Sequence, residues 1–227
     1  MIPPLMLFAA GFGTRMGALT KGRPKPLINV AGRPLIDHAL DLAHDAGITR
    51  IVANTHYRAE MIEAHLAGTN VQTINEAPDI LETGGGLRNA LPLLDSDTVM
   101  TLNSDAVWAG PNPLLQLINA WDPTRMDALL LCVPVAQTHG YSGTGDFALQ
   151  PDGQILRGSG PVYAGAHILK TARLHDVADT AFSLNVVWNA MAADGRLHGT
   201  TYPGQWCDVG HPDGIAAAEA MLTAHDV

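Results

Sequence analysis

The chain has 227 residues, of which 47% are hydrophobic and 15% are charged, so it can bury a sizeable core and is not a disordered protein. Its 13 basic and 22 acidic residues give a formal net charge of −9, which argues against a general nucleic-acid binder because such proteins present a basic face. No apolar run approaches the ~20 residues of a membrane span, and the apolar N-terminus lacks the basic start of a signal peptide. We therefore expect a cytoplasmic protein that binds neither nucleic acid nor a membrane.

Apolar runs alternate with helical patterns through the first half of the chain. Strands are predicted at Leu5–Ala10, Arg50–Asn54, Val71–Asn75, Thr98–Leu102 and Ala128–Pro134, of which the first and the fourth are expected to be buried. Helices are predicted at Pro34–Ala46, Ala59–Ala67, Gly85–Leu91 and Asn112–Ala120. This alternation of strands and helices predicts an α/β fold, with a mainly parallel sheet between helices on both faces.

The second half of the chain is less regular. Short strands are predicted at Asp146–Leu149, Gln154–Leu156, Val162–His167 and Leu197–Tyr202, and helices at Leu184–Ala193 and Asp213–Thr223. Strands clustered between two helical regions suggest an insertion packed on the parallel sheet, since antiparallel additions to such sheets are common. We expect one compact domain over residues 1–227.

Cysteine and histidine usage gives no sign of a disulfide framework or a zinc site. Cys132 and Cys207 lie far apart and in no C-x-x-C pair, so we expect two reduced, packed thiols. The ten histidines are scattered and form no zinc-binding pattern. A nucleophile elbow of the Gly-x-Ser-x-Gly type is also absent from the sequence.

A glycine loop follows the first predicted strand and carries Gly11, Gly13 and Arg15. Ligands of open α/β sheets bind at the carboxyl ends of the strands, where glycines let backbone N–H groups approach a phosphate or a base. Residue 16 is methionine, so the third glycine of a dinucleotide fingerprint is missing, and no Gly-Lys-Ser/Thr completes a P-loop. Beyond the loop, two prolines stiffen the backbone around Lys25, whose charge could balance that of a polyphosphate.

The segments Leu7–Met16, Leu19-Thr20 and Pro24–Leu27 together resemble the signature of sugar-1-phosphate nucleotidyltransferases. The resemblance continues through Val30–Ile36 into the last third of the chain. It implies that a nucleoside triphosphate and a sugar 1-phosphate give a nucleotide sugar and pyrophosphate. It also implies one nucleotidyltransferase domain with a Rossmann-like three-layer sandwich around a mixed, mainly parallel central sheet, of the nucleotide-diphospho-sugar transferase type.

The resemblance implies which residues contact the triphosphate, with Arg15 and Lys25 as catalytic cations. The nucleotide-binding residues are expected to be Ala10, Gly11, Gly13, Thr14, Arg15, Lys25, Glu82, Thr83 and Gly84. Bare amides of Gly84–Gly86 could face a ligand at the start of the predicted helix, although a plain tight turn would use the same residues. Glu82 could bond a base or ribose edge, or cap that helix.

Two acids are candidate ligands for Mg²⁺. Asp105 comes just after the predicted strand 98–102, and Asp208 stands at a glycine turn before the last helix. Mg²⁺ prefers a couple of carboxylates together with phosphate oxygens and water. The alternatives are a turn residue at Asp105 and an N-cap-like acid at Asp208. The resemblance gives both acids the metal role, although Asn-Ser-Asp replaces the Asn-Gly-Asp of many relatives, and we expect the two to meet opposite segment 11–25.

Sugar-phosphate binding is expected at Asn103, Gly145 and Asp146 by the same resemblance. The glycine-rich stretch 139–145 is typical of a flexible loop that could cover a sugar, with Asp146 bonding its hydroxyls. A hairpin turn with a solvated acid is the alternative.

The implied reaction is an in-line displacement at the α-phosphorus, in which cations neutralise charge and no general base is needed. Within the family, Leu81–Gly86, Gly145–Phe147 and Gly204–Gly210 are most similar to enzymes of peptidoglycan recycling that transfer UMP to N-acetylmuramate α-1-phosphate. Uridylyl or thymidylyl transfer to glucose 1-phosphate and guanylyl transfer to mannose or heptose 1-phosphate stay open. Two other classes of protein also stay open. One is a non-catalytic nucleotide-sugar sensor, and the other is a nicotinamide oxidoreductase, although the missing third glycine argues against it.

Overall fold

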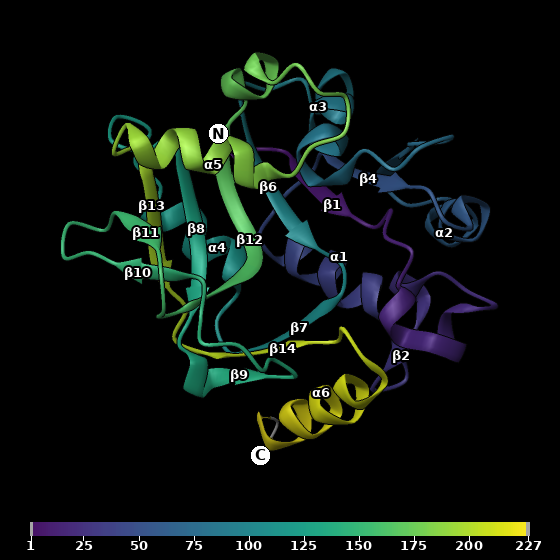
Figure 1. The fold of residues 1–227 in the computed structure, drawn as a ribbon. Coiled ribbons are helices and arrows are strands. Elements are labelled where there is room, and N and C mark those ends of the chain that lie inside the picture. The colour runs from purple at the N-terminus through teal and green to yellow at the C-terminus, as the bar shows by residue number, and fades with distance from the viewer. Residues whose placement is uncertain (1, 226–227) are drawn as a thin grey trace.

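A central sheet of seven strands runs through the computed structural model, which describes residues 2–225 (Figure 1). The strand order is β13-β8-β12-β6-β1-β4-β5. Its strands are β1 (Leu5–Phe8), β4 (Ile51–Thr55), β5 (Val71–Asn75), β6 (Thr98–Asn103), β8 (Ala128–Val133), β12 (Val162–Lys170) and β13 (Leu197–Thr201). All pairings are parallel except those of β12, which runs antiparallel between β6 and β8. The sheet is therefore mixed and mainly parallel, as the sequence predicted.

Residues 2–225 form six α-helices, of which α6 lies below the central sheet in Figure 1. They are α1 (Leu35–Asp45), α2 (Ala59–Leu66), α3 (Glu82–Leu94), α4 (Pro113–Ala120), α5 (Leu184–Ala193) and α6 (Pro212–His225). Helices α1 and α4 pack on one face of the sheet, and α3 and α5 pack on the other. Asn112 begins α4 by accepting hydrogen bonds from the amides of Leu114 and Leu115.

Alternate residues of the central strands divide the core into two layers. Leu5 and Leu7 of β1 face the layer under α1 and α4, whereas Met6 faces the layer under α3 and α5. All three side chains are fully buried, because both faces of the sheet are covered. This double burial explains why the central strands are continuous apolar runs in the sequence.

Smaller sheets lie beside the central one. A three-stranded sheet joins β7 (Ala106–Ala109), β14 (Gln205–Asp208) and β9 (Thr138–His139) in the order β7-β14-β9, and α6 packs against it. Two further pairs form hairpins, β10 (Phe147–Leu149) with β11 (Ile155–Arg157) and β2 (Asn29–Val30) with β3 (Arg33–Pro34). The 3₁₀ helices are η1 (Thr14–Thr20), η2 (Lys25–Leu27), η3 (Val135–Gln137) and η4 (Ala172–Asp176).

Two expectations about the elements need correction, and one small sheet was not expected. Strand β12 lies within the central sheet instead of on it, because it hydrogen-bonds to both β6 and β8. Helix α3 is longer than the predicted Gly85–Leu91 and includes the three glycines. The sheet of β7, β14 and β9 was not predicted. Only Ser104 and Asp105 separate β7 from β6, so the sequence shows no clear break between two strands there.

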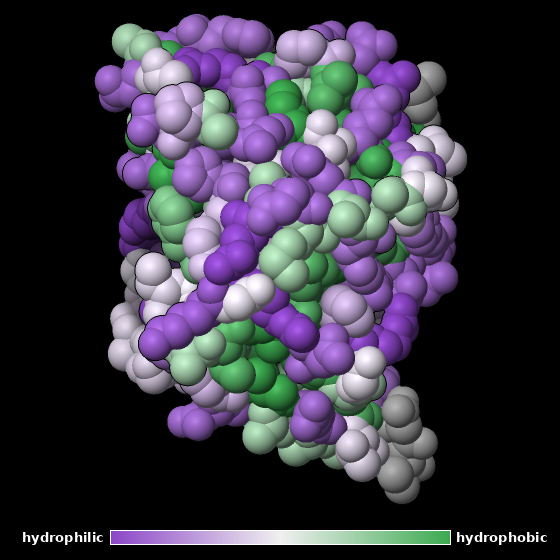
Figure 2. All heavy atoms as spheres, turned by 90° about the vertical axis from the view of Figure 1, so that its right-hand side faces the viewer, coloured by the Kyte–Doolittle hydropathy of each residue, from purple (hydrophilic) through white to green (hydrophobic). Residues whose placement is uncertain are grey.

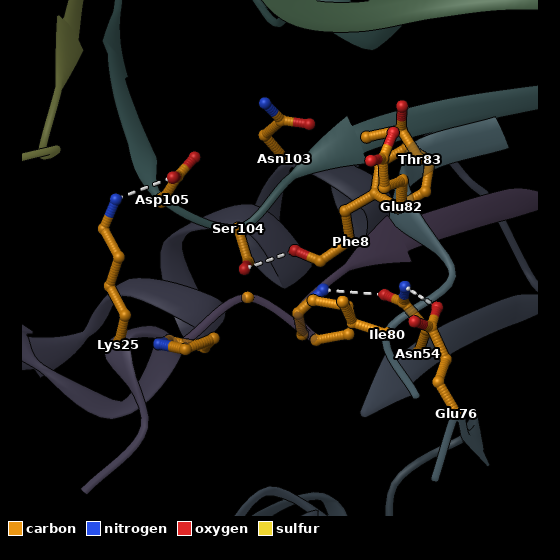
Figure 3. Close-up of a pocket in the computed structure, with 14 residues that line it drawn as sticks. Phe8, Lys25, Asn54, Glu76, Ile80, Glu82, Thr83, Asn103, Ser104 and Asp105 are labelled. Atoms are coloured by element: carbon orange, nitrogen blue, oxygen red, sulfur yellow. Dashed lines mark hydrogen bonds and ion pairs between the residues drawn. The ribbon is translucent and has the colours of Figure 1, made fainter. Parts of the chain in front are cut away.

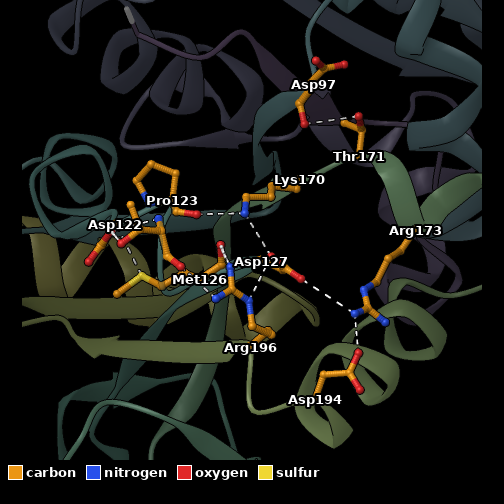
Figure 4. A network of polar contacts seen from close by, with 11 residues as sticks. Asp97, Asp122, Pro123, Met126, Asp127, Lys170, Thr171, Arg173, Asp194 and Arg196 are labelled. Carbon is orange, nitrogen blue, oxygen red and sulfur yellow. Dashed lines mark hydrogen bonds and ion pairs between the residues drawn. The ribbon is translucent and has the colours of Figure 1, made fainter.

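A network of charged side chains joins strand ends at the amino edge of the sheet (Figure 4). Asp127, just before β8, accepts hydrogen bonds from Lys170 at 3.0 Å and Arg196 at 3.0 Å, and Arg173 pairs with Asp194. Burial alone would raise the pKa of Asp127, but the bonds from Arg196 and Lys170 outweigh it and hold the pKa below its ordinary value. This network fastens the end of β12 to the starts of β8 and β13.

The two cysteines are free and buried, as predicted, and burial raises the thiol pKa of each to about 12. No helix among residues 2–225 has the length and apolar composition needed to cross a membrane. The face that lies to the right in Figure 1 is largely hydrophilic, with hydrophobic side chains visible between the polar ones (Figure 2).

Buried His167 is expected to make the protein less stable as the pH falls. Its Nδ1 lies 2.6 Å from Thr101 Oγ1 and 2.7 Å from Tyr163 Oη, and burial lowers its pKa to about 3. Below pH 6.5, its ordinary pKa, the imidazole is protonated in the unfolded chain but stays neutral in the folded protein. The free energy of unfolding therefore decreases as the pH falls from 6.5 to 3. At pH 5 this amounts to about 2 kcal/mol.

Urea unfolding of His167→Gln at pH 7 and pH 5 measures this contribution. The variant is expected to lose about 2 kcal/mol less than the unmodified protein between the two pH values. Exposed His175→Gln is the control and should leave the pH dependence unchanged. Equal pH dependence in all three proteins would contradict the assignment to His167.

Candidate active site

A cavity of about 210 Å³ opens at the carboxyl ends of β1, β4 and β6 (Figure 3). This is the edge of the sheet where ligands of α/β proteins bind. Its lining residues are Phe8, Ala9, Ala10, Gly11, Lys25, Pro26, Asn54, Glu76, Ile80, Glu82, Thr83, Asn103, Ser104 and Asp105.

The glycine loop after β1 forms one wall of the cavity. Nothing lies within 4 Å of the place where a side chain on Gly11 would begin, so its backbone is open to a ligand. Gly13 serves packing instead, since it has a φ of +63° and a methyl group there would stand 2.9 Å from Cβ of Lys25. Thr20 Oγ1 donates to the carbonyl of Gly13 at 3.1 Å and holds η1 against the loop. Thr14 and Arg15 are exposed at the start of η1.

Lys25 and Asp105 form an ion pair at the mouth of the cavity. Lys25 Nζ donates to Asp105 Oδ2 at 2.7 Å, as Figure 3 shows. The lysine side chain is 9% exposed and that of Asp105 is 32% exposed, so most of the lysine stem is packed in the protein while the carboxylate reaches the solvent. Pro24 and Pro26 flank the lysine at the start of η2.

Asp208 lies next to Asp105 because of the small sheet. Strand β14 pairs with β7 so that Asp208 stands opposite Ala106, and Val209 N donates to the carbonyl of Asp105 at 3.0 Å. Burial raises the pKa of Asp208, the negative charge of Asp105 adds to the rise, and Lys25 and Arg15 oppose it.

Arg15 completes this group of charges from the glycine loop. A methyl group at Gly210 would stand 2.8 Å from Asp208 Oδ2 and 3.0 Å from Arg15 Nη1, so the two side chains approach the same glycine. Two acids from distant parts of the sequence and two cations from its start therefore meet at one place.

Among residues 2–225, no three His, Cys, Asp or Glu side chains gather closely enough to hold a metal ion by themselves. The pair of Asp105 and Asp208 nevertheless fits Mg²⁺, which commonly takes one or two carboxylates and completes its shell with phosphate oxygens and water. The two acids would therefore supply carboxylate ligands if the ion bound here, with phosphate oxygens and water as the others.

Asn103 and Ser104 complete the floor of the cavity. Asn103 ends β6 and packs against Gly165, where a methyl group would stand 2.8 Å from its Nδ2 and the φ is +80°. Ser104 is buried and donates to the carbonyl of Phe8 at 2.6 Å. The serine of Asn-Ser-Asp therefore ties the end of β6 to β1 and leaves Asn103 and Asp105 at the cavity.

The glycines of α3 do not offer bare amides to a ligand, so this expectation is wrong for Gly84 and Gly85. Both amides donate to the carbonyl of Phe182, at 2.8 and 3.1 Å. A methyl group on Gly84 would stand 2.3 Å from the Phe182 ring. Gly84 lies outside the cavity lining, whereas Glu82 and Thr83 belong to it, and no side chain caps the start of α3.

Gly145 and Asp146 lie outside the lining of the cavity, beside the start of β12. Gly145 N donates to Tyr141 Oη at 3.2 Å, and Asp146 Oδ2 accepts from the amide of Tyr163 at 2.9 Å. Thr144 is held through its carbonyl by the amide of Gly160. The flexibility expected of residues 139–145 stays a prediction.

Residues 5–141 match the family model of the MobA-like NTP transferase domain. The chain belongs to this family. The match confirms the resemblance to sugar-1-phosphate nucleotidyltransferases and gives no support to a nicotinamide oxidoreductase.

Relatives of known name cover almost the whole chain. It is 40% identical to the N-acetylmuramate alpha-1-phosphate uridylyltransferase of Caulobacter vibrioides, over 96% of each chain. It is 31% identical to the enzyme of that name from Neisseria meningitidis, over 96% of this chain and 98% of the relative. A mannose-1-phosphate guanylyltransferase of Mycobacterium tuberculosis is 26% identical, over 96% of this chain and 64% of the relative.

Two solved structures share the fold. HddC from Yersinia pseudotuberculosis, complexed with GMP-PN, superposes with a TM-score of 0.77 at 21% identity, over 96% of this chain and 99% of that chain. Apo-UDP-glucose pyrophosphorylase gives 0.78 at 17% identity, over 99% and 100%. The predicted fold type of the nucleotide-diphospho-sugar transferases is confirmed.

Sequence reasoning missed two buried polar residues of the cavity, Asn54 and Glu76. Asn54 stands near the end of β4, and Glu76 directly follows β5. The rule that singled out Asp105, a polar side chain at the carboxyl end of a buried strand, applies to Asn54 and could have found it. Glu76 follows the edge strand β5, which is only partly buried, so this rule does not single it out. The contacts of Asn54 and Glu76 also explain why residue 86 of α3 is a glycine.

Gly86→Ala is expected to destabilise the protein by about 1–3 kcal/mol. A methyl group there would stand 2.4 Å from Glu76 Oε1 and 3.0 Å from Asn54 Nδ2, so a buried pair would have to move. Elsewhere in a helix the same change usually stabilises by about 1 kcal/mol. Denaturant unfolding measures the effect, with Gly22→Ala, which enters open space, as the control. A variant as stable as the unmodified protein would show that Asn54 and Glu76 can move aside at no cost in stability.

Proposed function

We propose that this protein transfers UMP from UTP to N-acetylmuramate α-1-phosphate and releases UDP-N-acetylmuramate and pyrophosphate. The observation that supports this most is the identity of 40% and 31%, over nearly the full chain, to two enzymes of that name. The reaction would return a cell-wall sugar to synthesis, as in peptidoglycan recycling. Residues 1–227 would act as one nucleotidyltransferase domain in the cytoplasm, where nucleoside triphosphates are made.

The nucleotide would bind between the glycine loop and the start of α3. Ala10 and Gly11 line one side of the cavity, where the backbone of Gly11 is open, and Glu82 and Thr83 line the other. Gly13 and Thr14 would contribute by holding the backbone that leads to Arg15. The amide of Gly84 donates to the carbonyl of Phe182, so we assign Gly84 no direct contact with the nucleotide. It would act by letting α3 approach the segment that contains Phe182.

Asp105 and Asp208 would hold Mg²⁺ on the triphosphate. The closeness of the two acids supports this, since two neighbouring carboxylates repel each other unless a cation joins them. When bound, Mg²⁺ neutralises phosphate charge and orients the α-phosphate as a Lewis acid.

Arg15 and Lys25 would supply the remaining positive charge. An oxygen of the sugar 1-phosphate attacks the α-phosphorus of UTP while the bond from that phosphorus to the bridging oxygen of the β-phosphate breaks, and pyrophosphate leaves with that oxygen. The attacking oxygen is already ionised, so no residue has to remove a proton. The two cations lower the repulsion between the anionic reactants and stabilise charge on the leaving pyrophosphate.

The sugar 1-phosphate would bind beyond Asn103. Asn103 lies on the cavity floor next to Asp105, and its amide could donate to the sugar phosphate. Gly145 and Asp146 lie on the next stretch of this edge, near the start of β12. One oxygen of Asp146 accepts from Tyr163 N, which leaves the other carboxylate oxygen for a sugar hydroxyl.

A panel of UTP, dTTP and GTP against the 1-phosphates of N-acetylmuramate, glucose, mannose and heptose tests the proposal. Pyrophosphate release with Mg²⁺ is the readout, and UTP with N-acetylmuramate α-1-phosphate is expected to give the highest kcat/KM. Clear turnover of another pair without turnover of this one would replace the substrates and keep the reaction. Nucleotide-sugar binding without turnover of any pair would favour a non-catalytic sensor.

A further inference from the structure

The end of β4 lies between the two walls of the cavity. Asn54 of β4 stands opposite Phe8 of β1 on one side and Ile74 of β5 on the other. The loop after β1 is the glycine wall, and the loop after β5 leads through residues 76–81 into α3, which is the opposite wall. Any side chain that bonds both loops from β4 fixes their separation.

Asn54 makes both bonds. Its Oδ1 accepts from the amide of Ala9 at 2.8 Å, and its Nδ2 donates to Glu76 Oε1 at 2.6 Å. The first bond decides the orientation of the amide group, because the Ala9 N–H needs the oxygen. The NH₂ of Asn54 must then face an acceptor, and Glu76 provides it.

Glu76 continues the chain of bonds into the second wall. Its Oε2 accepts from the amide of Leu81 at 2.8 Å, one residue before α3. Glu76 is only 4% exposed, and no Lys, Arg or His of residues 2–225 pairs with it. A buried carboxylate without a cation is costly, so its two hydrogen bonds are what make the charge tolerable. We call the four groups, Ala9 N, Asn54, Glu76 and Leu81 N, the brace.

A second link joins the same walls nearer the surface. Phe12 of the glycine loop packs edge-on against His56, with ring centres 5.1 Å apart. His56 Nε2 lies 3.1 Å from the carbonyl of Pro78, in the loop of the opposite wall. Both links start from the β4 end, so this strand is the common support of the two loops.

We propose that Asn54 and Glu76 are positioning residues that set the width of the nucleotide-binding cleft. The inference rests on the proposed function, since it takes the nucleotide to bind between the glycine loop and Glu82-Thr83. The brace ends at Ala9 and Leu81, next to the lining residues Ala10 and Glu82. Figure 3 shows its central pair, Asn54 bonded to Glu76, below Glu82 and Thr83. Lys25 and Asp105 lie on the other side of the cavity, so the brace acts on binding of UTP more than on the chemical step.

Exchanging donor and acceptor separates positioning from direct contact. In Glu76→Gln, only one oxygen remains for two donors, Asn54 Nδ2 and Leu81 N, so the new NH₂ must face one of them. In Asn54→Asp, two carboxylates face each other. In the double variant Asn54→Asp/Glu76→Gln, the new carboxylate at position 54 accepts from Ala9 N and from the new NH₂ at position 76. The amide oxygen at position 76 accepts from Leu81 N, so every bond of the brace is restored with the charge moved to position 54.

The test measures kcat and KM for UTP in the unmodified protein, both single variants and the double variant. Each single variant is expected to raise KM at least about tenfold with kcat within about threefold, and the double variant to return KM to within about threefold of the unmodified value. Exposed Asn119→Asp and Glu60→Gln repeat the two changes elsewhere and should alter neither constant. If Asn54→Asp does not fold, Glu76→Gln and the double variant carry the same comparison.

The outcomes separate this inference from the function that it rests on. Absence of turnover by the unmodified protein with every substrate pair overturns the proposed function and the inference with it. Normal turnover with unchanged KM in both single variants overturns the inference alone. A raised KM that the double variant fails to restore also overturns it, because the charge at position 76 would then act on the nucleotide directly.

Discussion

Asp105→Asn is expected to lower kcat/KM by at least about 100-fold, close to 3 kcal/mol of transition-state stabilisation. The change keeps the size of the side chain and removes its charge. Two losses follow from it. The 2.7 Å bond from Lys25 Nζ loses its anionic acceptor, and the proposed Mg²⁺ site keeps only Asp208 as a carboxylate ligand. The Mg²⁺ concentration that gives half-maximal rate should therefore rise together with the loss of rate.

Asp41→Asn is a matched control for this variant. Asp41 accepts from Arg33 at the same 2.7 Å, but both side chains are about half exposed and lie outside the cavity lining. Exposed ion pairs contribute little, so kcat/KM should change less than about twofold. Activity of Asp105→Asn within about tenfold of the unmodified enzyme, with an unchanged Mg²⁺ dependence, would remove Asp105 from the metal site.

The meeting of Asp105 with Asp208 shows what a single sequence can and cannot reveal. Each acid was found from its local setting, after a strand or before a helix, and from the family signature. Their contact depends on the pairing of β7 with β14, whose strands are almost 100 residues apart in the sequence. Alternation of apolar residues marks where strands are, but it does not order them in a sheet, and β12 between β6 and β8 is another case.

The glycines of α3 show a second limit. A run of three glycines indicates that something approaches the backbone closely, and it does not indicate what. The structure puts Phe182 and Thr180 against Gly84 and Gly85, and Glu76 against Gly86. A ligand and a distant part of the same chain both require a residue without a side chain, so the sequence does not distinguish them. The strands that are buried on both faces were easier to predict, because their apolar runs follow from local composition.

Lys25→Met is expected to lower kcat/KM at least about 100-fold, because the variant keeps an apolar stem of similar length and loses the charge beside the phosphates. Lys25→Arg should rescue little of this. The stem of Lys25 packs against Gly13, where a methyl group would stand 2.9 Å from Lys25 Cβ, and the guanidinium is too wide to take the place of a compact ammonium against Asp105. Pyrophosphate release with saturating Mg²⁺ measures both variants.

The double variant Lys25→Met/Asp105→Asn tests whether the ion pair acts as one unit. Removal of Lys25 alone leaves Asp105 without its 2.7 Å partner, and removal of the Asp105 charge alone does the same to the ammonium. If both residues act on the same phosphates, the second change should cost much less than it does alone, so that the double variant loses less than the product of the two single losses. Full multiplication of the losses would mean that the lysine and the acid act on separate steps. Loss of less than about tenfold in Lys25→Met would exclude its role in charge neutralisation altogether, since one tenfold step is only about 1.4 kcal/mol.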